Sequence, residues 1–177
     1  MRPTTIAAPL LMLGYGIARW IDGFDGARHN GPAWPVGHTM FFLAMVLFAV
    51  QAVALAGRSM SALAWPALAA TLVGVFCFLW VITQDLFSGF TADLPGVLNA
   101  VGPPLFVVGL VTLLTLQVVA RRLPFWSPIA FLVGYLAISV DLDLLPFASL
   151  VLIAGSIPVA SSIRPRAGVD SSRIVIR

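Results

Sequence analysis

Long apolar runs separated by short polar breaks dominate this chain of 177 residues. A helix that crosses a hydrocarbon core of about 30 Å needs about 20 residues, because each residue adds about 1.5 Å. The apolar runs approach that length repeatedly. The pattern predicts six transmembrane helices, at about residues 5–21, 38–56, 63–84, 103–120, 128–140 and 144–160, followed by a polar tail at 164–177.

The last two helices are inferred from a single polar break. The apolar pattern from 128 to 160 would form one helix about 50 Å long, which is too long for one span. Asp141-Leu142-Asp143 is the only polar interruption, and Pro146 suits the first turn of a new helix. We therefore expect two short helices that meet here, the second capped by Asp143.

Composition places this pattern in a membrane. Of the residues, 60% are hydrophobic and only 10% are charged, and the mean hydropathy is +1.01. A water-soluble domain of this size would still expose about a third of its surface, so the excess apolar surface must face lipid. We expect an all-α integral membrane bundle that occupies 1–163 as one domain, with the lipid bilayer as its partner.

The arginine distribution predicts the orientation. With the N-terminus inside, the cytoplasmic segments hold eight of the ten arginines: Arg2, Arg58, Arg121, Arg122, Arg164, Arg166, Arg173 and Arg177. This bias follows the positive-inside rule and places both termini in the cytoplasm. Basic residues that are all arginine indicate a GC-rich bacterial genome, and hence the bacterial inner membrane. The net charge of +3 is scattered, so nucleic acid is not an expected partner. The oligomeric state stays open.

Acidic residues gather on the opposite, outer side. Asp22, Asp85 and Asp141 close the three helices that run outward, where the negative end of the helix dipole disfavours a carboxylate. A proton on such a carboxylate removes the unfavourable charge, which suits a general acid. These three aspartates are the first catalytic candidates, and His38 at the start of the second helix is the next. The alternative is a structural ion pair between Arg19 and one of these aspartates.

Aromatic residues gather at the same end. They could form an interfacial belt, or they could line an apolar pocket whose ring faces stabilise a cation. The candidates for substrate binding are Tyr15, Trp20, Phe41, Phe42, Trp80 and Phe87. Neither a metal nor a cofactor is expected, because Cys77 is the only cysteine and the two histidines lack ligand spacing.

In its size, its aspartates at one membrane face and its aromatic residues, the chain resembles the small integral-membrane terpene cyclases of meroterpenoid and indole-terpenoid pathways. The resemblance implies an isomerase- or lyase-type enzyme that protonates an alkene or epoxide of a hydrophobic, isoprenoid-like substrate. Two other classes stay open. One is a non-catalytic membrane subunit or lipid-binding protein. The other is a proton-coupled transporter, which the scarcity of polar residues in mid-helix disfavours.

Overall fold

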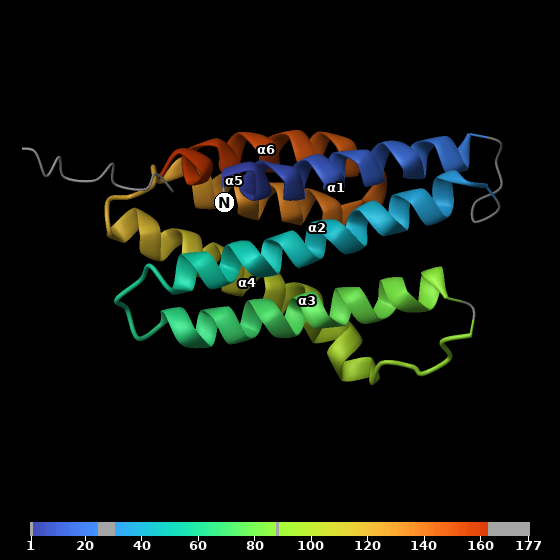
Figure 1. The fold of residues 1–177 in the computed structure, drawn as a ribbon, viewed down its shortest axis with the longest axis horizontal. Helices are drawn as coiled ribbons and strands as arrows, with labels where there is room; N and C mark the ends of the chain where they lie inside the picture. The colour runs from blue at the N-terminus through green and yellow to red at the C-terminus, as the bar shows by residue number, and fades with distance from the viewer. Residues whose placement is uncertain (1, 25–30, 88, 163–177) are drawn as a thin grey trace, which may run out of the picture.

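Six helices make up the part of the chain that the structure describes, which is residues 2–24, 31–87 and 89–162 of a computed structural model (Figure 1). The helices are α1 (Arg2–Gly23), α2 (Ala33–Ala56), α3 (Ala64–Leu86), α4 (Gly96–Val119), α5 (Trp126–Val140) and α6 (Leu145–Ser162), with a 3₁₀ turn, η1 (Leu142–Leu144), before α6. No strand occurs in these residues, so the predicted all-α class is confirmed. The predicted tail at 164–177 lies outside the described residues.

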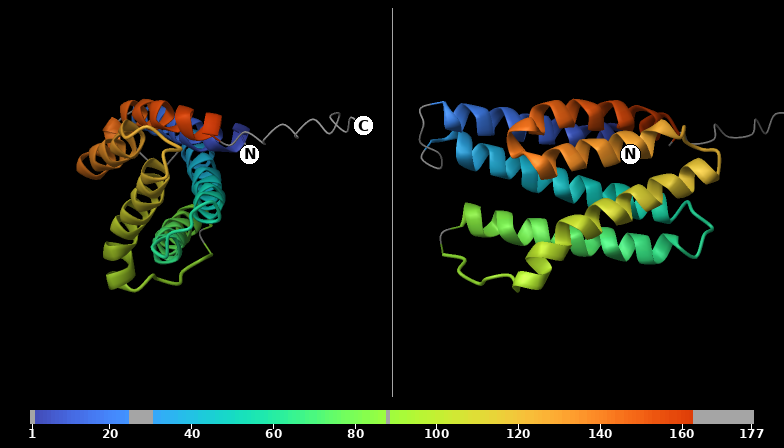
Figure 2. Two further views of the ribbon diagram at one scale, coloured as in Figure 1. Left: turned by 90° about the vertical axis from the view of Figure 1, so that its left-hand side faces the viewer. Right: turned by 180° about the vertical axis from the view of Figure 1, so that it is seen from behind.

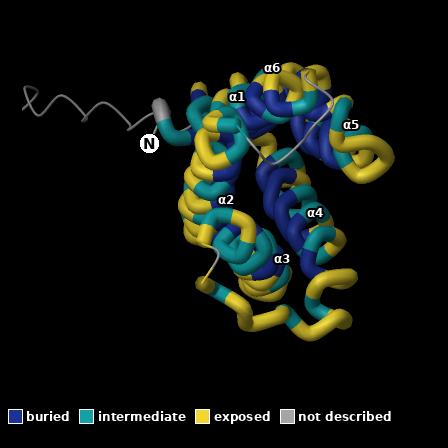
Figure 3. Tube along the Cα trace, turned by 90° about the vertical axis from the view of Figure 1, so that its right-hand side faces the viewer, coloured by how far each residue is buried: buried dark blue, intermediate teal, exposed yellow. Residues whose placement is uncertain are grey.

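The helices are apolar on nearly every side. Five of them are long and apolar enough to cross a membrane, and α5, with 15 residues, is shorter. Large apolar side chains such as Leu10, Val108 and Ile129 are half exposed or more on the outside of the bundle, while its inner faces are buried (Figure 3). A helix with apolar residues all round is stable only within protein or lipid. The chain is therefore an integral membrane bundle.

α2 and α4 begin five or more residues earlier than the sequence predicts, and proline is the reason in both cases. The first turn of a helix has free N–H groups, so proline is tolerated there. Accordingly α2 begins at Ala33, not at 38, and takes Pro35 into its first turn. α4 begins at Gly96, not at 103, and Pro103 and Pro104 lie inside it. Proline inside a helix removes a hydrogen bond and bends the axis, and α4 bends in this region (Figure 1).

The chain breaks between α5 and α6 where the sequence predicts, but with different capping. The Asp141 carboxylate accepts a hydrogen bond from the backbone N–H of Asp143 at 2.8 Å and so caps η1. The Asp143 carboxylate accepts one from Nε of Arg19 at 3.2 Å. At the other end of α5, Ser127 lies inside the helix, where its hydroxyl donates to the Gly155 carbonyl at 2.7 Å. This bond ties α5 to α6.

The helices form a ring. Each helix packs against its neighbours in the chain, and α6 packs against α1 to close the circle. Within the described residues, α3 and α5 do not contact each other. In both end views α2 and α3 form one arm of a V-shaped arrangement and α4 forms the other, with α5 near its closed end (Figures 2 and 3).

Small residues bring α3 and α4 together. A Cβ on Gly74 would lie 2.5 Å from the Phe106 Cβ, and one on Gly102 would lie 2.5 Å from the Cys77 Cβ. Both distances are too short for real atoms, so only glycine fits at these positions. Close approach through small residues is the usual way in which membrane helices gain packing energy.

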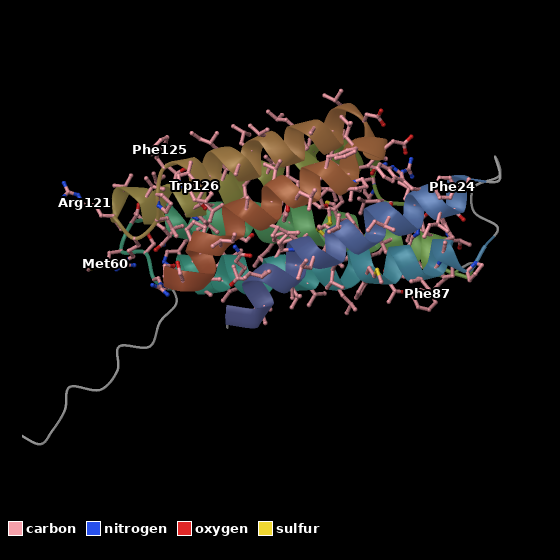
Figure 4. The ribbon with its side chains drawn as sticks, turned by 90° about the horizontal axis from the view of Figure 1, so that it is seen from above. Phe24, Met60, Phe87, Arg121, Phe125 and Trp126 are labelled. Atoms are coloured by element: carbon pink, nitrogen blue, oxygen red, sulfur yellow. The ribbon has the colours of Figure 1, made fainter. Side chains whose placement is uncertain are left out.

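The two ends of the bundle differ in charge. The polar end holds Asp22 and Asp85 near the ends of α1 and α3, and Asp141 and Asp143 at the break between α5 and α6. The arginine end holds Arg58, Arg121 and Arg122; Arg58 donates to the Ser162 carbonyl at 3.0 Å, and Arg122 donates to the Arg58 carbonyl. Figure 4 shows Phe24 and Phe87 at the polar end and Arg121, Phe125 and Trp126 at the arginine end.

Candidate functional site

A cavity of about 310 Å³ lies inside the polar half of the bundle. Small-molecule pockets typically measure about 300–1,000 Å³, so a compact ligand would fit. Residues of α1, α2, α3, α5, η1 and α6 line the cavity, and none comes from α4. Its polar residues are Arg19, His38 and Asp85, and its aromatic ones are Tyr15, Trp34, Phe41, Phe78 and Tyr135.

The His38 imidazole and the Asp85 carboxylate face each other at the polar end of this cavity. His38 Nδ1 lies 2.9 Å from the carbonyl oxygen of Trp34. Because a carbonyl oxygen only accepts hydrogen bonds, Nδ1 must carry a hydrogen. Nε2 then faces the Asp85 carboxylate, with 3.5 Å between Nε2 and Oδ2. An imidazole nitrogen and a carboxylate oxygen are the groups that most often exchange protons in general acid–base catalysis.

Close packing between α1 and α2 holds the His38 ring in place. The Trp34 and His38 ring centroids are 3.7 Å apart, and Tyr15 meets His38 edge-on at 5.4 Å. Gly37 makes this approach possible, since a Cβ there would lie 3.0 Å from the Ala18 Cβ. The imidazole is buried, with its side chain 3% exposed, whereas the Asp85 side chain is 38% exposed. Asp85 is thus the member of the pair that an incoming molecule can reach.

A series of ring contacts continues from His38 through α1 to α5, and all of its rings except Phe106 line the cavity. Tyr15 contacts Phe41 with centroids 5.0 Å apart, and Phe41 contacts Phe78 at 5.7 Å. Phe106 then contacts Phe78 at 5.7 Å and Tyr135 at 5.0 Å. Aromatic faces stabilise a cation within about 6 Å of the ring centroid. A positive charge formed inside the cavity would therefore lie near several rings.

Arg19 and Trp20 fasten the tip of the α5–α6 hairpin to α1. Arg19 pairs with the Asp143 carboxylate at 3.2 Å, and the Trp20 indole donates to the Asp143 carbonyl at 3.0 Å. Trp20 also packs edge-on against Phe147. These contacts bring Leu142 and Leu145 to the cavity, where both form part of its lining. Arg19, which the sequence suggested as an ion-pair partner of an aspartate, also lines the cavity.

The structure brings some of the predicted site residues together and leaves others apart. Tyr15, His38, Phe41 and Asp85 line the cavity. Asp22 is buried beside an adjoining space of about 10 Å³, which is also lined by Trp34 and His38.

The remaining predicted residues lie outside the cavity lining. Asp141 is exposed and caps η1, and Phe42 packs against the core. Trp20 is bound to the α5–α6 tip, as described above. Trp80 donates to the Ala92 carbonyl at 2.8 Å on the outside of α3. Phe87 is 62% exposed at the polar end (Figure 4).

Sequence reasoning missed the lower half of the cavity. Phe78, Tyr135 and Ile138 all line it, but each lies in an apolar helix whose pattern is hydrophobic on every side. Such a pattern carries no signal that separates an inward face from a lipid-facing one. Trp34 falls in a segment predicted to be a loop. The one sequence signal for an inward-facing position was Tyr135, an aromatic residue with a hydroxyl group within apolar α5.

Among the described residues, no three histidine, cysteine or acidic side chains converge where they could hold a metal ion. No protein-family model, curated protein or solved structure matches this chain. The functional conclusion therefore depends on the geometry of the cavity.

Proposed function

We propose that this protein is an intramembrane enzyme that protonates an apolar, isoprenoid-like substrate and so starts its cyclisation. The observation that carries the proposal is the His38–Asp85 pair, with 3.5 Å between Nε2 and Oδ2, at the polar end of an aromatic-lined cavity. Cation formation from an alkene needs a strong acid, a dry pocket and stabilising ring faces. The described residues provide a carboxyl group, apolar walls and aromatic rings.

In the proposed reaction Asp85 is the acid. Its carboxyl proton adds to one carbon of the alkene next to the polar head of the substrate, and the π electrons form the new C–H bond. The cation left on the other carbon is attacked by a second double bond, which closes a ring. Loss of a proton to the Asp85 carboxylate, or to Nε2 of His38, forms a new alkene. The product is an isomer of the substrate, so no oxidant, reductant or cofactor is consumed.

The orientation in the membrane is part of the same proposal. Arg58, Arg121 and Arg122 lie at the end opposite Asp85. Under the positive-inside rule, this end faces the cytoplasm of a bacterial cell and the acid faces outward.

Isotope incorporation tests the proposal. The full chain in lipid nanodiscs is incubated with farnesol in D₂O, and cyclised isomers are analysed by mass spectrometry. Protonation from Asp85 predicts a product that carries one carbon-bound deuterium. Asp85→Asn should abolish this product, whereas the matched variant Asp141→Asn should keep it because Asp141 lies outside the cavity lining.

The same experiment distinguishes the enzyme from a second function, that of a lipid-binding subunit. The cavity is also what a lipid-binding subunit without catalysis requires. Farnesol that binds but is recovered without deuterium, together with equal binding by Asp85→Asn, would support that second function and reject the enzyme.

A further inference from the structure

The cavity is about as deep as one leaflet of a bilayer. On α2 it extends from Trp34 near the polar end to Met45, which is about 16 Å along a helix axis. Half of a hydrocarbon core measures about 15 Å. Arg19, His38 and Asp85 lie at the shallow end and Met12, Met45 and Tyr135 at the deep end. The distribution of polar and apolar groups therefore parallels that of a lipid in the leaflet at the polar end.

On the side between α3 and α5, no residue of α4 lines the cavity. α3 and α5 both line it without contacting each other. The two edges of this gap are apolar, with Phe78 and Val81 on α3 and Ile138 on α5. Water-filled entrances carry polar edges, whereas these edges suit contact with hydrocarbon.

The course of the chain before α4 explains why the gap stays uncovered. The Trp80 indole and the Gln84 amide both donate to the Ala92 carbonyl, at 2.8 and 3.0 Å. Trp80 lies about 9 Å before the end of α3, so the segment after α3 doubles back along its outer side. α4 then starts away from the gap and meets α3 at Gly102, beside Cys77 and next to Pro103; Figure 2 shows its first turns away from the other helices.

We propose that the gap between α3 and α5 is a lateral entrance, through which a single-chain lipid passes from the leaflet at the polar end into the cavity. Its polar head stays beside Arg19 and Asp85, and its chain extends towards Met12 and Met45. A volume of about 310 Å³ suits one chain and is too small for a two-chain phospholipid. This inference rests on the proposed function, which makes the cavity the substrate site. It adds that the substrate is a single-chain lipid and that it enters from the bilayer.

Photolabelling in proteoliposomes tests this route. The probe is a C15 isoprenoid alcohol that carries a diazirine on its chain, dissolved in the bilayer. We expect it to label peptides that contain Met12 and Met45. Val81→Trp and Ile138→Trp, which fill the gap, should lower this labelling at least fivefold. The matched variants Val73→Trp and Val133→Trp add the same bulk to exposed positions of the same helices and should leave it unchanged.

A reversible closure guards against misfolded variants. Val81→Cys and Ile138→Cys are combined with Cys77→Ala, and the two thiols are joined by a bifunctional reagent with a reducible spacer. Closure should block labelling of the cavity, and reduction should restore it. Labelling that persists after closure, or a wild-type cavity that is never labelled, would overturn the lateral entrance.

Entry and chemistry have separate readouts. Labelling is also measured in Asp85→Asn, where the proposed acid is absent. A labelled cavity without any deuterated product would reject the proposed reaction and keep the entrance. Deuterated product that forms equally well with the gap closed would reject the entrance and keep the reaction.

Discussion

The imidazole Nε2 of His38 and the carboxylate Oδ2 of Asp85 lie 3.5 Å apart and connect the start of α2 to the end of α3. The histidine is buried and its other nitrogen is fixed by the Trp34 carbonyl, whereas the Asp85 side chain is partly exposed and lines the cavity. A partly exposed ion pair contributes little to the free energy of unfolding. The difference in exposure therefore favours a role of the pair in proton transfer over a role in stability.

Asp85→Asn should therefore affect rate and stability differently. Loss of a general acid typically costs about 10²–10⁴-fold in rate. Loss of a partly exposed pair should cost less than about 1 kcal/mol of unfolding free energy. The deuterium-incorporation rate and unfolding in mixed micelles measure the two effects. A large loss of stability with little change in rate would assign the pair to structure.

Arg19 and Asp143 should show energetic coupling. Their bond fastens the α5–α6 tip to α1, and a partly exposed ion pair of this kind should couple by up to about 1 kcal/mol. A double-mutant cycle with Arg19→Gln and Asp143→Asn measures this coupling by unfolding in mixed micelles. Arg19→Lys tests the same bond, because lysine keeps the positive charge but has no donor equivalent to Nε of arginine. Additive effects of the two substitutions would mean that the bond does not stabilise the tip.

Gly74→Ala should separate α3 from α4. The added Cβ would lie 2.5 Å from the Phe106 Cβ, and overpacking of this kind costs about 1–3 kcal/mol. Gly96→Ala is the control, because its Cβ would have no atom within 4 Å. Equal stability of the two variants would contradict the close packing of these helices.

Tyr135→Phe should keep or increase stability. The Tyr135 hydroxyl is buried and has no hydrogen-bond partner among the described residues. An unsatisfied buried polar group costs about 1–3 kcal/mol, so its removal recovers part of that cost. Thermal unfolding of the purified variant measures the change. A clear loss of stability would show that the hydroxyl is hydrogen-bonded in the membrane.

Trp80→Phe should release the segment that precedes α4. The indole N–H donates to the Ala92 carbonyl, and the ring packs edge-on against Phe90 at 5.0 Å. The phenylalanine keeps part of the ring contact but loses the donor. Hydrogen exchange of peptides covering 87–95 should become faster. Trp65→Phe, at an exposed position of the same helix, should leave this exchange unchanged.

The apolar pattern predicted six helices because a bilayer requires both a minimum length and backbone groups that are bonded within each element. The break at 141–143 was found for the same reason, since one helix over that stretch would be too long. The boundaries of α2 and α4 were missed where proline stood. Proline can begin a helix or bend one, and the local sequence does not distinguish these roles.

The sequence by itself determined the class of the molecule, the number of helices and the end at which the aspartates gather. Only the tertiary structure decided which of these residues meet. Asp85 faces His38 because α2 and α3 pack together, and Asp141 is turned to the 3₁₀ cap instead. Lipid and protein interior are equally apolar, so hydrophobicity cannot show which face of a membrane helix points inward. The cavity and its open side arise from packing between helices, which the close fit of glycines and aromatic rings determines.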